Sequence, residues 1–226
     1  MKSLFALLTL STYLTACTTY QYYSMTGDLP LAEDQSFHFT SNAVEVNYKF
    51  GENGVLIMDI CNRSDAMIFI DWERSSLIFN QETIPFPQDE AYFQGNASYN
   101  HPLGQDFEGV IQSNPHRRYI PPKTRLKESV HLNFANYLNL NETIFEENTV
   151  TGSTKTYRYS KDNSPFAFQT YLYFSDLKEK KEPIIVHNSF WTQSIVSNMT
   201  EVTSQEYNQF ALEDYNDAGY GLFAIV

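Results

Sequence analysis

Alternating apolar and polar residues dominate the chain after residue 43, and this pattern predicts β-strands. Val44, Val46, Tyr48 and Phe50 alternate with polar residues, the period of two that a half-buried strand produces. Polar turn residues separate this segment from the next apolar runs. In the first half we expect strands at residues 44–50, 55–61, 66–70 and 76–79.

The same alternation returns in the second half of the chain. Every second position from 166 to 174 is apolar except Thr170; the apolar residues are Phe166, Phe168, Leu172 and Phe174. We expect further strands at residues 126–134, 154–160, 166–174 and 184–196, and residues 204–213 leave a short helix open. Short strands joined by polar turns predict an all-β, antiparallel sandwich or barrel.

The turn at residues 52–54 predicts how the first two strands pair. A three-residue loop ending in glycine is typical of a type I turn whose glycine adopts the left-handed conformation. This register pairs Phe50 with Leu56, Tyr48 with Met58 and Val46 with Ile60. A slip of one residue would exchange the two faces, so the same register directs Asp59 away from the core.

The first residues predict a secretory signal over 1–16, because Lys2 precedes an apolar run too short to span a bilayer. The sequence 14–17, Leu-Thr-Ala-Cys, resembles the lipobox of bacterial lipoproteins. That resemblance implies a diacylated Cys17 and attachment to the outer membrane. An ordinary signal peptide with a chance Cys17 is the alternative. Residues 17–35 are expected to be the lipidated cysteine and a tether, and residues 36–226 the sandwich domain.

The segment 62–80 carries a second resemblance. Its Asn-Arg-Ser-Asp turn and the following MIFIDWERSSLIFN resemble a pattern in uncharacterised Gram-negative lipoproteins that have an immunoglobulin-like β-sandwich. The Pro-Pro-Lys-Thr sequence at 121–124 resembles the start of a later strand in such domains. The resemblance implies the fold and the location, and its motifs bring no catalytic residue.

Composition narrows the classes of partner. The 226 residues include 15 Lys and Arg against 27 Asp and Glu, a net charge of −12, which argues against nucleic acid as a partner. The 2 cysteines exclude a disulfide-dense scaffold and a four-cysteine zinc site. If Cys17 is lipidated, Cys61 has no disulfide partner within the chain, and we expect it to be a small buried side chain.

Sequence motifs for catalysis are missing. The 5 histidines are scattered, and no nucleophile elbow, phosphate loop or dinucleotide fingerprint occurs. The acidic pair Asp71 and Glu73 is expected to be solvated surface. A loose calcium site near Asp214 and Asp217 stays open, although the EF-hand ligands at positions 5 and 12 are missing. We therefore predict a non-enzyme with no catalytic residue, metal or cofactor.

The candidate binding surface lies in and after an inserted loop expected at residues 87–122. The loop contains Tyr92, Phe93, Tyr99 and Phe107, and the basic residues Arg117, Arg118, Lys123 and Arg125 lie at its end and just after it. A connection of this length is usually functional or disordered, so a floppy insertion or an extra hairpin is the alternative. Clustered aromatic residues beside positive charge suit a protein interface or a glycan.

These observations lead to a ranked set of functions. The first is a non-enzymatic lipoprotein that binds a protein partner in an outer-membrane assembly, facing either side of that membrane. The second is a glycan-binding surface lipoprotein. A lipoprotein pilin is third, because pilins matured by trypsin-like cleavage need an exposed basic residue soon after the anchor. Here the first arginine is Arg63, and only Lys49 precedes it after Cys17.

Overall fold

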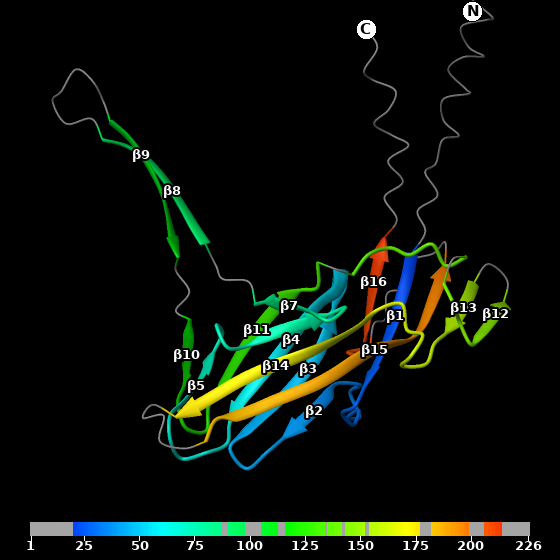
Figure 1. Ribbon diagram of the computed structural model, residues 1–226, viewed down its shortest axis with the longest axis horizontal. Helices are drawn as coiled ribbons and strands as arrows, with labels where there is room; N and C mark the ends of the chain where they lie inside the picture. The colour runs from blue at the N-terminus through cyan, green and yellow to red at the C-terminus, as the bar shows by residue number, and fades with distance from the viewer. Residues whose placement is uncertain are drawn as a thin grey trace, which may run out of the picture.

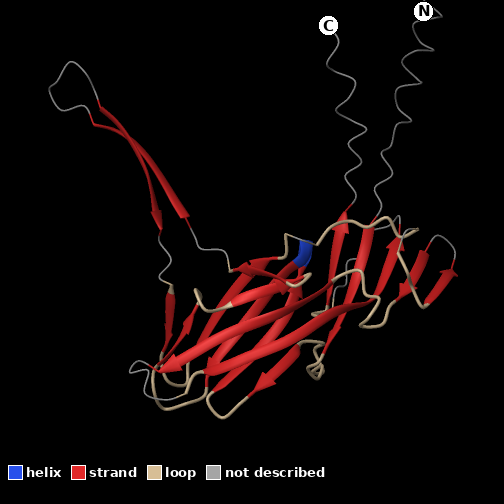
Figure 2. Ribbon diagram, viewed as in Figure 1, coloured by secondary structure: helices blue, strands red, loops and turns tan. Residues whose placement is uncertain are grey.

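The computed structural model contains two packed antiparallel sheets and a separate hairpin (Figures 1 and 2). It describes residues 20–86, 90–97, 105–112, 116–133, 135–141, 143–151, 154–176, 182–198 and 206–213, with backbone alone for 90–97 and 105–112. Within these residues the chain is all-β, as predicted, and its one helical element is a short 3-10 turn, η1 (Glu52–Gly54). None of the described segments forms a helix that could span a membrane.

The smaller sheet has the strand order β11-β4-β3-β2. Its strands are β2 (Phe37–Thr40), β3 (Val44–Gly51), β4 (Val55–Asn62) and β11 (Arg125–His131). The predicted register is confirmed, because Phe50 pairs with Leu56, Tyr48 with Met58 and Val46 with Ile60. Gly54 has the expected positive φ of 70°, but Asn53 also lies at φ 55°, so the predicted type I turn is wrong.

The larger sheet has the order β10-β5-β14-β15-β1-β16. These strands are β1 (Tyr20–Gly27), β5 (Ile68–Asp71), β10 (Arg117–Ile120), β14 (Ala167–Asp176), β15 (Ile184–Asn198) and β16 (Gln209–Glu213). Strands β6 (Ser76–Phe79) and β7 (Glu82–Pro85) extend the sheet from β14, and β12 (Glu147–Thr151) and β13 (Thr154–Arg158) extend it from β15. The long β15 therefore organises this sheet.

Two segments correct the sequence interpretation. The expected tether at 17–35 includes β1, which lies between β15 and β16 and buries Tyr22, Tyr23 and Met25. The short helix that the sequence left open within 204–213 is replaced by strand β16. This strand pairs with β1, and Phe210 stacks on Tyr23 with 4.9 Å between ring centroids. Burial between neighbouring strands decides the conformation in both places.

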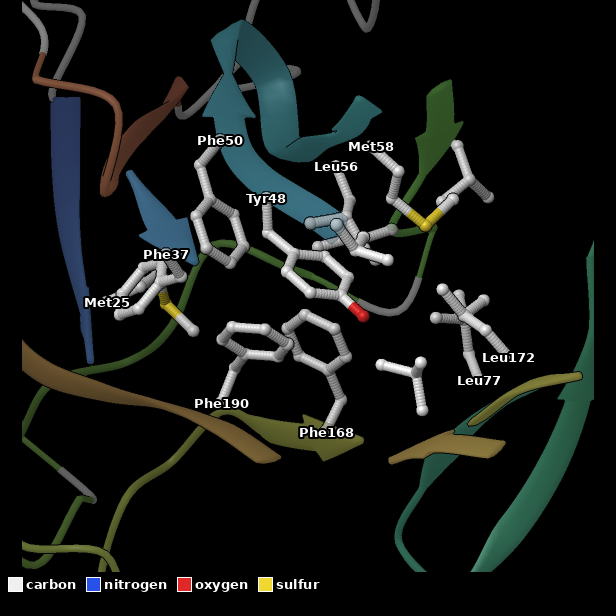
Figure 3. Close-up of a cluster of buried hydrophobic side chains, with 14 of the residues drawn as sticks. Met25, Phe37, Tyr48, Phe50, Leu56, Met58, Leu77, Phe168, Leu172 and Phe190 are labelled. Carbon is white, nitrogen blue, oxygen red and sulfur yellow. The ribbon is translucent and has the colours of Figure 1, made fainter. Parts of the chain in front are cut away.

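An aromatic core joins the sheets (Figure 3). Tyr48 and Phe50 point from β3 toward Phe168 on β14 and Phe190 on β15. The ring centroids of Tyr48 and Phe190 are 5.1 Å apart, and those of Phe168 and Phe190 are 5.3 Å apart. Cys61 lies outside this core: it follows the fully buried Ile60 on β4 and is half-buried, which corrects the expected buried side chain.

The segment 87–122, expected as one inserted loop, contains three strands. Strands β8 (Glu90–Ala97) and β9 (Gln105–Gln112) form a two-stranded antiparallel sheet, and β10 belongs to the larger sheet. Figure 1 shows β8 and β9 projecting away from the two packed sheets. The extra hairpin that the sequence left open as an alternative is therefore present.

Candidate functional site

The β8–β9 hairpin carries most of the predicted aromatic candidates. Its backbone register runs without interruption from the pair Glu90–Gln112 to the pair Ala97–Gln105. Residues paired directly in an antiparallel ladder share a face, and neighbours along a strand alternate between faces. The register therefore places Phe93 and Phe107 together on one face and Tyr92 on the other.

The two faces of the hairpin differ in charge. The face of Phe93 and Phe107 contains only uncharged positions, namely Ala91, Gly95, Ala97, Gln105, Gly109 and Ile111 in addition. The opposite face contains the acidic positions Glu90, Asp106 and Glu108. The hairpin is thus amphipathic by position, with an apolar face that we call the Phe93 face.

The predicted basic residues are engaged in ion pairs on the body of the protein. Arg118 Nε lies 3.8 Å from a Glu128 carboxylate oxygen, and Lys123 Nζ lies 3.1 Å from Asp65. Lys123 also donates to the carbonyl of Arg63 at 2.7 Å. Each positive charge has an acidic neighbour, so an anionic ligand would have to compete with these carboxylates for the basic side chains.

Arg125 is held in the same way on the outer face of the smaller sheet. Its Nη1 donates to Asp59 at 2.9 Å, and its Nη2 lies 3.7 Å from Glu45. The hydrogen bond and charge of Asp59 raise the pKa of the Arg125 guanidinium. Asp59 therefore faces away from the core, as the predicted register requires, and its partner is the candidate binding residue itself.

Arg117 contacts a buried carboxylate. Its Nε lies 3.4 Å from Asp71, which is 2% exposed, and its guanidinium lies 4.7 Å from the Phe69 ring centroid. Asp71 also accepts hydrogen bonds from the backbone N–H groups of Glu73 and Arg74. The expectation that Asp71 is solvated surface is wrong, because this carboxylate orders the turn after β5 and binds the edge strand β10 to it.

A strip of aromatic and amide side chains on the outward face of the larger sheet was missed from the sequence. Core-facing residues of β14 and β15 alternate with half-buried or exposed residues that face outward. We call the outward set the outer strip, and it consists of Gln169, Tyr171 and Tyr173 on β14 and Ile185, His187, Ser189 and Trp191 on β15. Charged residues are the usual occupants of a solvated face, so aromatic residues between the core positions were the available signal.

One end of the outer strip is hollowed. A cavity of about 330 Å³ is lined by Asn80, Gln81, Lys161, Gln169 and Trp191, among others, and we call it the Trp191 hollow. Asn80 and Gln81 form the two-residue turn between β6 and β7, with φ of 50° and 66°. Such a turn favours glycine at its second position, so Gln81 occupies a strained conformation at the rim.

A second hollow of about 350 Å³ lies beside the segment 137–141. Gln21, which lines it, already donates from Nε2 to the carbonyl of Leu138 and accepts from the Leu138 N–H and from the Tyr23 hydroxyl. Its polar atoms therefore serve the fold by attaching this segment to β1.

The remaining sequence predictions lie outside the described residues. These are Cys17, Tyr99, and the possible calcium ligands Asp214 and Asp217. Among the residues that the structure does describe, no group of three or more His, Cys, Asp or Glu side chains is arranged to hold a metal ion.

Comparisons of the chain with protein-family models, with curated proteins and with solved structures find no match. The two candidate sites, the Phe93 face and the Trp191 hollow, therefore rest on the geometry and chemistry of this chain's own residues.

Proposed function

We propose that this protein is a non-enzymatic envelope lipoprotein that binds a protein partner through the Phe93 face of the β8–β9 hairpin. Within the described strands, β8 and β9 pair only with each other, and they project from the body (Figure 1). A lone two-stranded hairpin is marginally stable in water and needs a further surface against its apolar face. This isolation is the observation that supports the proposal.

The charge of the hairpin favours a protein over other partners. Residues 90–112 contain Glu90, Asp106 and Glu108 but neither lysine nor arginine. Nucleic acid and anionic lipid both require clustered positive charge, which this segment lacks. A hairpin with one uncharged face and an acidic opposite face suits a protein surface that combines an apolar groove with nearby basic residues.

The proposed anchor is a lipid on Cys17 in the outer membrane, with the body an immunoglobulin-like sandwich. Only Thr18 and Thr19 separate Cys17 from the first residue of β1. Three residues of extended chain span about 10 Å, so a lipidated Cys17 would hold the sandwich close to the bilayer. Replacing Cys17 by Ala should release the protein from the membrane fraction, and unchanged fractionation would contradict the anchor.

Affinity capture from envelope extracts tests the docking proposal. The bait is the full chain, compared with a variant in which residues 90–112 are replaced by a short Gly-Ser linker. We expect the variant to keep its β-sheet circular dichroism and cooperative unfolding but to lose the captured partner. Equal recovery of the same partner by both baits would contradict the proposal.

Point variants supply a matched control for this experiment. Phe93→Asp puts a carboxylate on the Phe93 face, and Gln94→Asp puts the same group on the opposite face. Recovery should fall at least tenfold for Phe93→Asp and change little for Gln94→Asp, because a carboxylate buried against an apolar surface is strongly unfavourable. Equal losses would show that the Phe93 face is not the interface.

A further inference from the structure

We infer that the Trp191 hollow binds a neutral pyranose sugar or a short oligosaccharide. This site lies on the body of the sandwich and is independent of the hairpin and of the partner proposed for it. Its walls come from the β6–β7 turn, from β14 and β15, and from Lys161 in the segment before β14.

The apolar surface of the hollow is provided by Trp191. Trp191 is half-buried, and its paired neighbours across the sheet are the small residues Ala167 on β14 and Thr26 on β1. Small neighbours leave room beside the indole ring. The flat C–H face of a pyranose packs well on such a ring, because an indole presents a large apolar surface with a negative face.

Lys161 lies over the indole of Trp191. Its Nζ lies 5.1 Å from the Trp191 ring centroid, and the residue is exposed. A cation over an aromatic ring is held weakly at an exposed position. A ligand can therefore displace the lysine side chain, whose ammonium remains close enough to donate to a hydroxyl.

The polar groups of the hollow match hydroxyls rather than charges. Asn80, Gln81, Gln169 and Ser189 line it, and none of the described residues that line it carries a carboxylate. Carboxamides and hydroxyls each donate and accept hydrogen bonds, as sugar hydroxyls do. These described residues therefore provide no carboxylate that could bind a cation, and only the Lys161 ammonium could bind an anion. A neutral polyhydroxylated ligand fits the lining best.

The amide of Gln169 is already oriented. Its Oε1 lies 2.8 Å from His187 Nε2, and its Nε2 has no hydrogen-bond partner among the described residues. Because the Gln169 carboxamide oxygen is fixed on His187, its amide nitrogen is oriented to donate a hydrogen bond to a ligand. A donor positioned before the ligand arrives reduces the entropy lost on binding.

The strained turn points to the same site. Gln81 is at φ 66°, a conformation that glycine adopts at no cost. Strain of this kind gathers at functional sites, where the side chain supplies something glycine cannot. At this rim Gln81 supplies a carboxamide.

The size and surroundings of the hollow limit the ligand. A volume of about 330 Å³ is at the small end of ligand pockets, which run from about 300 to 1,000 Å³. The outer strip continues along β14 from Gln169 to Tyr171 and Tyr173, at steps of about 6.7 Å for every second residue. A single sugar fits the hollow, and a short chain can extend along the strip.

Tryptophan fluorescence tests the inference directly. The chain has 2 tryptophans, and Trp72 is buried against Phe86, so Trp72→Phe leaves Trp191 as the only indole. Maltotriose, cellotriose and chitotriose are titrated separately into this protein. We expect at least one of them to change the Trp191 emission saturably, with a dissociation constant on the order of 1 mM or below. Calorimetry on the unaltered chain gives the same information if Trp72→Phe does not fold.

Variants separate a binding role from a structural one. Gln169→Ala and Trp191→Ala should each weaken the sugar at least tenfold, and Tyr119→Ala, an exposed aromatic on β10, should not change it. Gln81→Gly should raise the melting temperature while weakening the sugar, since strain is relieved and the amide is lost. Deleting residues 90–112 should leave the titration unchanged, which separates this site from the hairpin.

Two results would overturn the inference. One is no saturable response to any of the three oligosaccharides at concentrations on the order of 10 mM, by fluorescence or by calorimetry. The other is a bound sugar whose affinity is the same in Trp191→Ala as in the unaltered chain.

Discussion

The hydroxyl of Tyr48 on β3 donates a 3.1 Å hydrogen bond to Oδ1 of Asn188 on β15 and so connects the two sheets inside the core. The Thr170 hydroxyl donates to the same phenol oxygen at 3.3 Å. All three residues are buried. The aromatic core between the sheets thus contains a small polar network in which the phenol both donates and accepts.

Tyr48→Phe should lower the free energy of unfolding by about 1–3 kcal/mol, because Asn188 and Thr170 each lose a buried partner. Urea denaturation followed by circular dichroism measures the change. Tyr171→Phe is the matched control, since this phenol is half-buried on the outer strip. Equal stability of Tyr48→Phe and the unaltered protein would show that the network does not stabilise the fold.

Alkaline pH should destabilise the protein through its buried phenols. Burial raises the pKa of both Tyr23 and Tyr48 above the ordinary value of 10.0. The folded chain therefore keeps both phenols neutral where the unfolded chain ionises them, and the associated stability is complete below pH 10 and is lost as the pH rises further. Urea midpoints measured from pH 8 to 12 should fall above pH 10, and the fall should be smaller in Tyr48→Phe. Midpoints that stay constant above pH 10 would contradict this.

The contacts of Asp71 predict that Asp71→Ala is less stable than Arg117→Ala. Asp71→Ala removes the acceptor for two backbone N–H groups and leaves Arg74 and Arg117 without this shared carboxylate, so a loss of about 1–3 kcal/mol is expected. Arg117→Ala should cost less, because its side chain is 40% exposed and Asp71 keeps its other partners. Thermal unfolding of the two variants compares them. A greater loss of stability in Arg117→Ala than in Asp71→Ala would contradict the role assigned to Asp71 in this turn.

The turn after β4 depends on the side chain of Asn62. It is 0% exposed, donates to the carbonyls of Ala66 and Ile120, and accepts from the N–H and hydroxyl of Ser64. Asn62→Ala should therefore destabilise the protein by more than about 2 kcal/mol, since several buried groups lose partners together. Asn141→Ala, at an exposed asparagine in the same Asn-X-Thr/Ser context, is the control and should be nearly neutral. Equal effects of the two variants on the urea midpoint would contradict the assigned role.

The sequence was sufficient to predict the all-β class and the β3–β4 register, because strict alternation around a glycine turn leaves one register that buries Val46, Tyr48 and Phe50 together. It was not sufficient for β1. There the adjacent Tyr22 and Tyr23 are both buried and Gln21 is buried with them, so no alternation is visible. Strand β16 was missed for a similar reason, since only pairing with β1 makes it a strand.

The candidate sites were predicted unevenly. The sequence places Tyr92, Phe93 and Phe107 in one segment, but only a strand register could divide them between faces. The basic residues looked like an open patch because their partners Asp71, Glu128, Asp65 and Asp59 are distant in sequence. The Trp191 hollow combines a turn near residue 80 with strands near 169 and 191, and such a combination leaves no linear motif.

Site-specific photo-crosslinking in intact cells tests the central claim, that the Phe93 face holds a protein partner. A photoreactive phenylalanine analogue is placed at residue 93 in one full-length protein and at residue 94 in another, on opposite faces of the hairpin. We expect a discrete protein adduct from position 93 and a much weaker one from position 94. No protein adduct from position 93, or adducts of equal yield from both positions, would contradict it.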